Sequence, residues 1–553
     1  MPKRSLVCLA ALLALLAAAP VTGQSRAPAV SCESLAKMAL PDTTITMAKL
    51  VGAGEFEIPQ TPRGAGQGAP GAQGGPGGPG GPGGQASPSG QAGPGGPGGF
   101  GPQQTTDVKT LPAFCRIAAT LKPTSDSSIR IEVWMPTTTW NGKLLGVGSG
   151  GMAGSIIYTS SMPIGLTEAI KLGYAAANTD VGHDKSTESA DGVFLLGHPE
   201  KQIDFGYRAY HLMTVEAKEF IKAFYGAAAK HSYFIGCSLG SVNAMNEAKR
   251  YPEDYDGVIS GAPMTRIAPF NAAQLWPTIL IAKDPSKALS NAKISLLEKA
   301  VMQTCGTALD KQQGFLEDPS TCHFDPKTLL CKGADSADCL TAPQAEFVRQ
   351  MYQGPVNPRT GEVVFMGVPY GAEGQMGASG TNPHGSSLAV YRYGVHQDAN
   401  WDWKTLDFDK DIALAEKTVA PYMHVDADLN AFFNRGDKLM LYIGWEDYHN
   451  PLDTENYFKQ LLKNSPAKAD SMRLFVVPGM GHCNGGDGCG VFDKIAAMDK
   501  WVETGKAPDV LDSTKEQGGK VVMSRPLCAY PKVAKYKGSG DITEAVNFYC
   551  AEK

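Results

Sequence analysis

A serine between two glycines is the first candidate for chemistry in this chain. Gly236-Cys237-Ser238-Leu239-Gly240 follows the apolar run Tyr233-Phe234-Ile235 and precedes a helical pattern at 241–250. The spacing is that of the G-x-S-x-G elbow, a sharp strand-to-helix turn that exposes the serine hydroxyl. The motif alone is weak in a glycine-rich chain, but its flanking strand and helix are those that the elbow requires. Ser238 is therefore the candidate nucleophile.

A serine hydroxyl needs a base, and the base needs a carboxylate that orients it. In α/β-hydrolases the acid and then the histidine follow the serine along the chain. Asp447 and His482 come shortly after two apolar runs, 439–443 and 474–477. Loops at the carboxyl ends of such strands commonly carry functional groups. We predict a triad of Ser238, His482 and Asp447, and we expect the neighbouring side chains of Glu446 and His449 to point elsewhere.

Acyl transfer also needs two backbone N–H groups that stabilise the oxyanion. Leu239, the residue after the serine, would supply one. The cluster Gly148-Ser149-Gly150-Gly151 follows a predicted strand at 143–147, and we predict that Gly151 supplies the other. The alternative is that this cluster is simply a tight turn.

Cysteines adjoin both the candidate nucleophile and the candidate base. Cys237 precedes Ser238, and Cys483 follows His482. A disulfide between them would tie the two loops together. A redox or nucleophilic role for Cys237 is the alternative, but a side chain next to an exposed elbow serine faces the other way, which suits a structural link.

The elements that must position these residues alternate between short apolar runs and helical patterns. Strands are predicted at 129–134, 143–147 and 174–178, and an amphipathic helix at 207–225. Such alternation predicts an α/β fold with a mostly parallel sheet covered on both faces. The irregular block 266–425, rich in Trp, Tyr, Gly and Cys, predicts a lid inserted between core segments 24–265 and 426–553.

The N-terminal region indicates export. Lys3 and Arg4 precede an apolar run and a small-residue stretch, which predicts a signal peptide over 1–23 and a secreted or periplasmic protein. A membrane anchor is the alternative, but the apolar run is shorter than a span requires. The Gly/Pro-rich segment 61–104 has no apolar residue to bury until Phe100 and predicts a disordered surface insertion rather than collagen, whose strict glycine period it lacks.

Composition and charge indicate which kind of partner the protein binds. The 553 residues are 42% hydrophobic and carry a formal net charge of −5 without long runs of like charge. These charges do not indicate the positive surface that binds nucleic acid or an anionic membrane. We therefore expect a small-molecule substrate. The sequence does not predict the oligomeric state. Without Cys8 of the signal, eleven cysteines remain, and disulfides are their default state in an exported chain.

At these residues the chain resembles the tannase and feruloyl esterase family, which includes the hydrolase of mono(2-hydroxyethyl) terephthalate. The Cys-Ser and His-Cys pairs are the most specific points, beside Trp140-Asn141-Gly142-Lys143 and Gly444-Trp445-Glu446-Asp447. The resemblance implies the same triad and the disulfide Cys237–Cys483. It also implies four other disulfides, leaving Cys489 unpaired: Cys32–Cys115, Cys305–Cys322, Cys331–Cys339 and Cys528–Cys550.

The family's lid usually carries a calcium loop of carboxylates. In this chain the three corresponding positions are Gly306, Leu309 and Gln313, and Asp310 is one position out of register. Calcium takes several oxygen ligands, preferably carboxylates. We therefore predict that the calcium site is lost and that the protein has no cofactor.

The resemblance implies an esterase that acts on aromatic acid esters, feruloyl esterase-like, through an acyl-enzyme. Tannase-like or mono(2-hydroxyethyl) terephthalate hydrolase-like activity is the alternative within this class, and the sequence does not choose among them. A lipase would need a broad apolar lid, unlike 266–425. A non-catalytic binding protein on a hydrolase fold is the alternative from another class.

Overall fold

The structure is a computed structural model that describes residues 27–59, 106–160, 163–377 and 380–553. The expected signal peptide, 1–23, and the Gly/Pro-rich segment, 61–104, lie outside the described residues. Predictions about these two segments therefore stay predictions.

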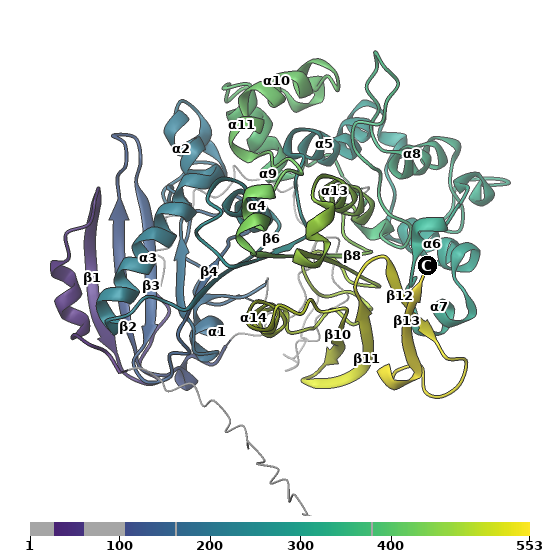
Figure 1. The fold of residues 1–553 in the computed structure, drawn as a ribbon. Coiled ribbons are helices and arrows are strands. Elements are labelled where there is room, and N and C mark those ends of the chain that lie inside the picture. The colour runs from purple at the N-terminus through teal and green to yellow at the C-terminus, as the bar shows by residue number, and fades with distance from the viewer. Residues whose placement is uncertain (1–26, 60–105, 161–162, 378–379) are drawn as a thin grey trace, which may run out of the picture.

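A mixed nine-stranded sheet forms the centre of the molecule, in the order β1-β2-β3-β5-β4-β6-β7-β8-β9 (Figure 1). The first three strands and the β3–β5 pair are antiparallel, whereas β5, β4, β6, β7, β8 and β9 are parallel. The strands are β1 (Thr43–Val51), β2 (Phe114–Leu121), β3 (Ile129–Pro136), β4 (Lys143–Val147), β5 (Ala175–Thr179), β6 (His231–Cys237), β7 (Gly257–Gly261), β8 (Lys438–Gly444) and β9 (Met472–Val477).

Helices cover both faces of this sheet. Successive strand residues point to opposite sides, and apolar side chains on both sides are buried against helices. Leu144 packs in one core cluster with residues of α3 (Ala209–Tyr225), α4 (Leu239–Arg250) and α13 (Pro451–Asn464). Its neighbour Leu145 packs in another with residues of α1 (Leu166–Lys171) and α14 (Lys494–Thr504). In Figure 1, α4 and α13 accordingly lie on the opposite side of the sheet from α14. This confirms the α/β-hydrolase fold.

A block of helices occupies the chain between β7 and β8, and it contains the segment predicted as a lid. Buried side chains from the stretch 280–376 of this block build a third core cluster, which includes Leu297, Phe347 and Met351. Figure 1 shows this block in teal and green along the top and the right of the view, with α10 and α11 above α4 and with α6 to α8 at the right. The helices are α5 (Ile267–Lys283), α6 (Asn291–Cys305), α7 (Ala308–Gln313), α8 (Ala342–Gln353), α9 (Gly385–Ala389), α10 (Lys410–Thr418), α11 (Ala420–Met423) and α12 (Asn430–Arg435); α2 (Pro199–Ile203) lies outside the block.

The C-terminal segment does not join the main sheet. After α14 it forms two separate two-stranded sheets, β10 (Val510–Gln517) with β11 (Lys520–Cys528), and β12 (Lys532–Tyr536) with β13 (Phe548–Glu552). β12 and β13 lie beside α6 and α7 in Figure 1, and Arg525 of β11 donates to the side chain of Gln313 in α7. The part of the chain predicted as the second half of the core, 426–553, therefore also carries an extension that contacts the lid.

The five disulfides of the structure have the pairing that the resemblance implies. They join Cys32–Cys115, Cys237–Cys483, Cys305–Cys322, Cys331–Cys339 and Cys528–Cys550. Cys489 is buried and unpaired, as expected. Several disulfides in one chain are typical of proteins outside the reducing cytosol.

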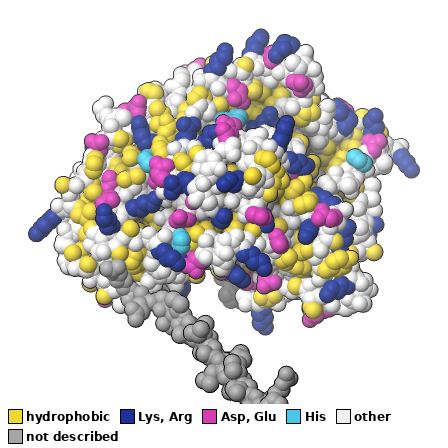
Figure 2. Space-filling view, in the orientation of Figure 1, with side chains coloured by type: hydrophobic (Ala, Val, Ile, Leu, Met, Phe, Trp, Pro, Cys, Tyr) yellow, Lys and Arg dark blue, Asp and Glu magenta, His cyan; other side chains and the backbone are white. Residues whose placement is uncertain are grey.

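Charges of both signs are interspersed over the face that Figure 2 presents, with no large patch of one sign. Within the described ranges, no helix combines the length and the apolar character that crossing a membrane would require.

Candidate active site

Ser238 occupies the turn between β6 and α4, with φ of 60° and ψ of −126°. Non-glycine residues rarely adopt positive φ, and this strained turn is the elbow that the G-x-S-x-G motif predicts. The Ser238 N–H donates to the carbonyl oxygen of Gly261 at 3.1 Å, which ties the elbow to the end of β7. The side chain is half-buried, so the hydroxyl remains within reach of solvent.

The glycines of the motif are required by close backbone contacts. A Cβ at Gly236 would lie 2.2 Å from the carbonyl oxygen of Gly240, inside the elbow. A Cβ at Gly240 would lie 3.1 Å from the carbonyl oxygen of Ser149, and one at Gly148 would lie 3.0 Å from the Cα of Gly236. The elbow and the Gly148–Gly151 loop are thus packed backbone against backbone.

Asp447 and His482 meet from the loops after β8 and β9. The Nδ1 of His482 lies 3.0 Å and 3.1 Å from the two carboxylate oxygens of Asp447. Asp447 is fully buried, and its Oδ1 also accepts the backbone N–H of His449 at 2.9 Å. This geometry assigns the Nδ1 hydrogen to the Asp447 side and leaves Nε2 of His482 as the free base.

Electrostatics favours the ionised form of Asp447. Burial alone would raise the pKa of this carboxyl, but the positive charge of protonated His482 and the hydrogen bonds from His482 and from the His449 backbone N–H outweigh burial and lower it. A carboxylate that stays ionised can hold the His482 ring in one orientation and stabilise its protonated form.

The disulfide Cys237–Cys483 brings the elbow and the histidine loop together. Its two Cα atoms lie 6.0 Å apart, although the residues are 246 positions apart in sequence. Ser238 and His482 each adjoin one end of this bond. Because Cys237 is bonded in the structure, it is not a free thiol, which argues against the alternative that it acts as a nucleophile.

The two predicted oxyanion donors lie on adjoining segments. Leu239 is the first residue of α4, where a backbone N–H has no acceptor within the helix. Gly151 is exposed, with φ of 60°, in the loop after β4. The start of that loop is held by Asn178, whose Nδ2 donates to the Val147 carbonyl at 2.6 Å, and by a hydrogen bond of 2.7 Å from the Ser149 N–H to the Tyr210 hydroxyl.

The expectation that both neighbours of Asp447 point elsewhere is wrong for His449. Its ring centroid lies 4.4 Å from that of His482, and its Nδ1 lies 2.8 Å from the Ala262 carbonyl oxygen. Burial, and then the charge of His482, lower the pKa of His449 to about 3. His449 therefore stays neutral beside His482 and donates to Ala262. Its position two residues after Asp447 was the available sequence signal.

Aromatic rings gather beside His482. The Tyr448 ring lies 4.6 Å from His482, and both Phe270 of α5 and His384 lie within about 6.4 Å of Tyr448. Phe270 and His384 come from the block between β7 and β8. The sequence suggested an aromatic lid, but only the folded chain identifies these residues.

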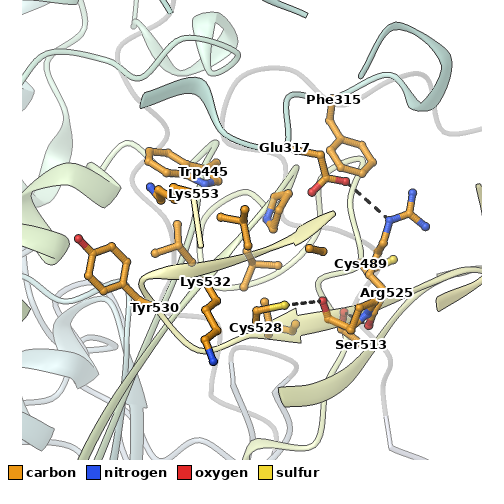
Figure 3. Close-up of a pocket in the computed structure, with 17 residues that line it drawn as sticks. Phe315, Glu317, Trp445, Cys489, Ser513, Arg525, Cys528, Tyr530, Lys532 and Lys553 are labelled. Atoms are coloured by element: carbon orange, nitrogen blue, oxygen red, sulfur yellow. Dashed lines mark hydrogen bonds and ion pairs between the residues drawn. The ribbon is translucent and has the colours of Figure 1, made fainter. Parts of the chain in front are cut away.

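In the loop for which the sequence predicts a lost calcium site, the polar side chains bind other partners. Gly306 and Leu309 have no side-chain oxygen, and Asp310 caps α7 by accepting the Thr307 N–H at 2.9 Å. The Gln313 amide oxygen accepts from Arg525 at 2.8 Å. Figure 3 shows the Arg525 guanidinium facing Glu317, with 3.7 Å between the paired atoms. A guanidinium from β11 thus supplies positive charge beside this loop.

The pocket in Figure 3 lies between β9 and the C-terminal strands, and none of Ser238, Asp447 and His482 lines it. Its lining includes Trp445, Cys489, Arg525 and Tyr530, with apolar side chains of β9 and β11. Burial raises the pKa of the Cys489 thiol to about 11. This thiol is therefore protonated and unreactive at neutral pH.

Fold and site together define an α/β-hydrolase, and comparison with known proteins gives the family. The family model for tannase and feruloyl esterase matches residues 115–551. The chain therefore belongs to the tannase and feruloyl esterase family, and it is a carboxylic ester hydrolase.

Relatives of this chain are esterases. It is 35% identical to an uncharacterised esterase of Xanthomonas campestris, over 81% of this chain and 86% of the relative. It is 31% identical to the mono(2-hydroxyethyl) terephthalate hydrolase of Piscinibacter sakaiensis, with the same coverage of 81% and 86%. The crystal structure of feruloyl esterase B from Aspergillus oryzae superposes with a TM-score of 0.78 at 26% identity, covering 94% of this chain and 99% of that one.

Proposed function

We propose that this protein is an exported serine esterase that hydrolyses esters of aromatic acids, with Ser238, His482 and Asp447 as its catalytic triad. The observation that carries the proposal is the arrangement of Asp447 against Nδ1 of His482, with Cys237–Cys483 tying that histidine to the elbow of Ser238. Signal-directed export rests on the sequence pattern of 1–23, and the disulfides are consistent with it.

The mechanism follows from the roles of these groups. His482 takes the proton of Ser238 through Nε2, and the serine oxygen attacks the ester carbonyl. The N–H groups of Leu239 and Gly151 stabilise the oxyanion, and the alcohol leaves with the proton from His482. Water activated by the same histidine then releases the acid. Asp447 orients His482 and stabilises its positive charge.

Aromatic rings beside the base support an aromatic acyl group. The rings of Tyr448 and His384, which are not fully buried, provide flat surfaces near His482 on which an aromatic ring can stack, and the buried Phe270 packs against Tyr448. The family name and the named relatives point to the same class of ester. Within this class, tannase-like and mono(2-hydroxyethyl) terephthalate hydrolase-like activities are the alternatives to feruloyl esterase activity.

The test is hydrolysis of methyl ferulate, methyl gallate, mono(2-hydroxyethyl) terephthalate and a long-chain acyl ester by wild type and by Ser238→Ala. We expect turnover of at least one aromatic ester, loss of that turnover by about 10³-fold or more in Ser238→Ala, and normal turnover in Ser286→Ala, an exposed serine. Preference for the long-chain ester would indicate a lipase. A wild-type protein that neither hydrolyses any ester nor reacts with a fluorophosphonate would be a binding protein.

We also propose that the protein functions without calcium, because its loop lacks the ligands and contacts Arg525 instead. We expect a chelator to leave both kcat and the thermal midpoint unchanged. Arg525→Met should lower the thermal midpoint by removing the contacts with Gln313 and Glu317. A midpoint that falls with the chelator and recovers with added calcium would contradict this proposal.

A further inference from the structure

A buried histidine, His183, contacts the loop that carries Gly151, and the mechanism proposed above does not use it. His183 follows β5, and its side chain is 1% exposed. Its Nε2 lies 2.6 Å from the carbonyl oxygen of Met152, the residue after Gly151. Its Nδ1 lies 2.5 Å from Oε1 of Glu188.

The protons of this pair have a defined arrangement. Met152 presents only a carbonyl acceptor to Nε2, so this contact is a hydrogen bond only if Nε2 carries a hydrogen. On the other side, one proton must lie between Nδ1 and Glu188, whichever of the two holds it. In both cases His183 donates from Nε2 to the Met152 carbonyl, and the histidine and carboxyl together are neutral.

Further contacts fix the histidine ring against the loop. The Phe194 ring is stacked on it with centroids 3.7 Å apart and planes 13° apart. A Cβ at Gly154 would lie 2.5 Å from Cε1 of His183, so the backbone approaches the ring directly. The Lys185 N–H donates to the Gly154 carbonyl at 3.0 Å. The loop is therefore attached to the segment after β5 at two successive points.

Gly151 is spanned by one local hydrogen bond, from the Ala153 N–H to the Gly150 carbonyl oxygen at 3.1 Å. It is exposed, it has positive φ, and its neighbour Gly150 is also exposed. Glycine is the residue with the greatest backbone freedom, so a donor at this place depends on its flanks. On one flank Ser149 is bonded to Tyr210, and on the other Met152 is bonded to His183.

We propose that His183 and Glu188 are positioning residues for the oxyanion hole, holding the Gly151 N–H in place through the Met152 carbonyl. This inference rests on the proposed esterase function. Oxyanion donors act because they are preorganised, and a misplacement of about 1 Å can reduce the rate by about 10²-fold. Since the donor acts on the transition state, its misplacement should lower kcat and leave KM nearly unchanged.

Two substitutions at His183 separate positioning from general stability. The amide of His183→Gln reaches as far as Nε2 and can still donate to Met152, whereas that of His183→Asn reaches only as far as Nδ1. We expect His183→Asn to lower kcat by about 10- to 100-fold at unchanged KM, and His183→Gln to recover most of that loss. His198→Asn is the matched control: His198 also pairs with a carboxylate, Asp126, at 2.7 Å, and His183 and His198 both line one surface pocket.

The measurement is kcat and KM on the best aromatic ester, with the thermal midpoint of each variant. A wild-type kcat in His183→Asn, or equal losses in the Asn and Gln variants, would overturn the inference while leaving the esterase proposal intact. Absence of any turnover in wild type would overturn both. If His183→Asn does not fold, Phe194→Leu is the second variant, because Phe194 stacks on the His183 ring. We expect this variant to lose about three- to tenfold in kcat at constant KM. An unchanged kcat would refute the inference.

Discussion

At the scale of single residues, the site combines a buried acid with two histidines in different states. Asp447 is ionised and bonds to Nδ1 of His482, whereas His449 is held neutral by burial. A second positive charge at 4.4 Å would oppose protonation of the base during catalysis. The neutral state of His449 therefore suits a general base at His482.

Asp447→Asn tests the assignment of the acid. The substitution keeps the shape of the side chain but permits the wrong tautomer of His482, so kcat should fall by about 10⁴-fold with a small effect on KM. Glu446→Gln is the matched control, because Glu446 adjoins Asp447 without contacting Nδ1 of His482. Similar losses in both variants would mean that Asp447 is not the specific partner of the histidine. The measurement is steady-state kinetics on an aromatic ester.

At the scale of elements, the elbow depends on backbone contacts between β6, α4 and the loop after β4. Gly236, Gly240 and Gly148 allow these segments to approach more closely than any side chain would permit. The disulfide Cys237–Cys483 then fixes the loop after β9 to the same point. The loops after β4, β6 and β9 are therefore fixed relative to one another.

Removing this disulfide should affect both stability and turnover. The double variant Cys237→Ala/Cys483→Ala should lose about 2–5 kcal/mol of unfolding free energy and much of its kcat. Cys331→Ala/Cys339→Ala is the control, since this bond spans 8 residues rather than 246 and lies away from the triad in sequence. Denaturant unfolding and ester hydrolysis provide the two measurements. A full kcat in the first variant would show that packing alone positions His482.

At the scale of the whole molecule, the lid and core enclose several carboxyl groups that favour the protonated form. Burial, the largest cause in each case, raises the pKa of Glu317 and of Glu373 to about 7 and that of Glu446 to about 8. Their ordinary pKa is 4.5. The folded state thus holds protons that the unfolded chain releases between pH 4.5 and about 7 to 8, and its stability falls as pH rises through this window.

Glu373→Gln tests this pH dependence. Glu373 is fully buried, and one of its oxygens accepts from Tyr352 at 2.9 Å, which the amide can preserve. We expect the thermal midpoint of the variant to fall less than that of wild type between pH 5 and pH 8, by on the order of 2 °C. The exposed Glu362→Gln is the control. Parallel curves for wild type and Glu373→Gln would contradict the prediction.

Local patterns predicted much of the fold and the candidate residues. The predicted strand at 143–147 matches β4, and the helix predicted at 207–225 is largely α3, preceded by a π-helical turn, Asp204–Arg208. The first two strands of the sheet, β1 and β2, were not predicted. The burial pattern of β1 loses its alternation from Ala48 onward, and β1 pairs with β2 across about 70 positions of sequence.

Local sequence signals were enough to select the residues of the proposed triad: Ser238 between glycines, and Asp447 and His482 after apolar runs. These are local signals, because an elbow and a strand end are defined by neighbouring residues. Only the tertiary structure placed His449 beside His482, Arg525 against Gln313, and His183 against Met152. The latter two contacts join segments 212 and 31 residues apart, and all three depend on how strands and lid pack in space, which no local pattern encodes.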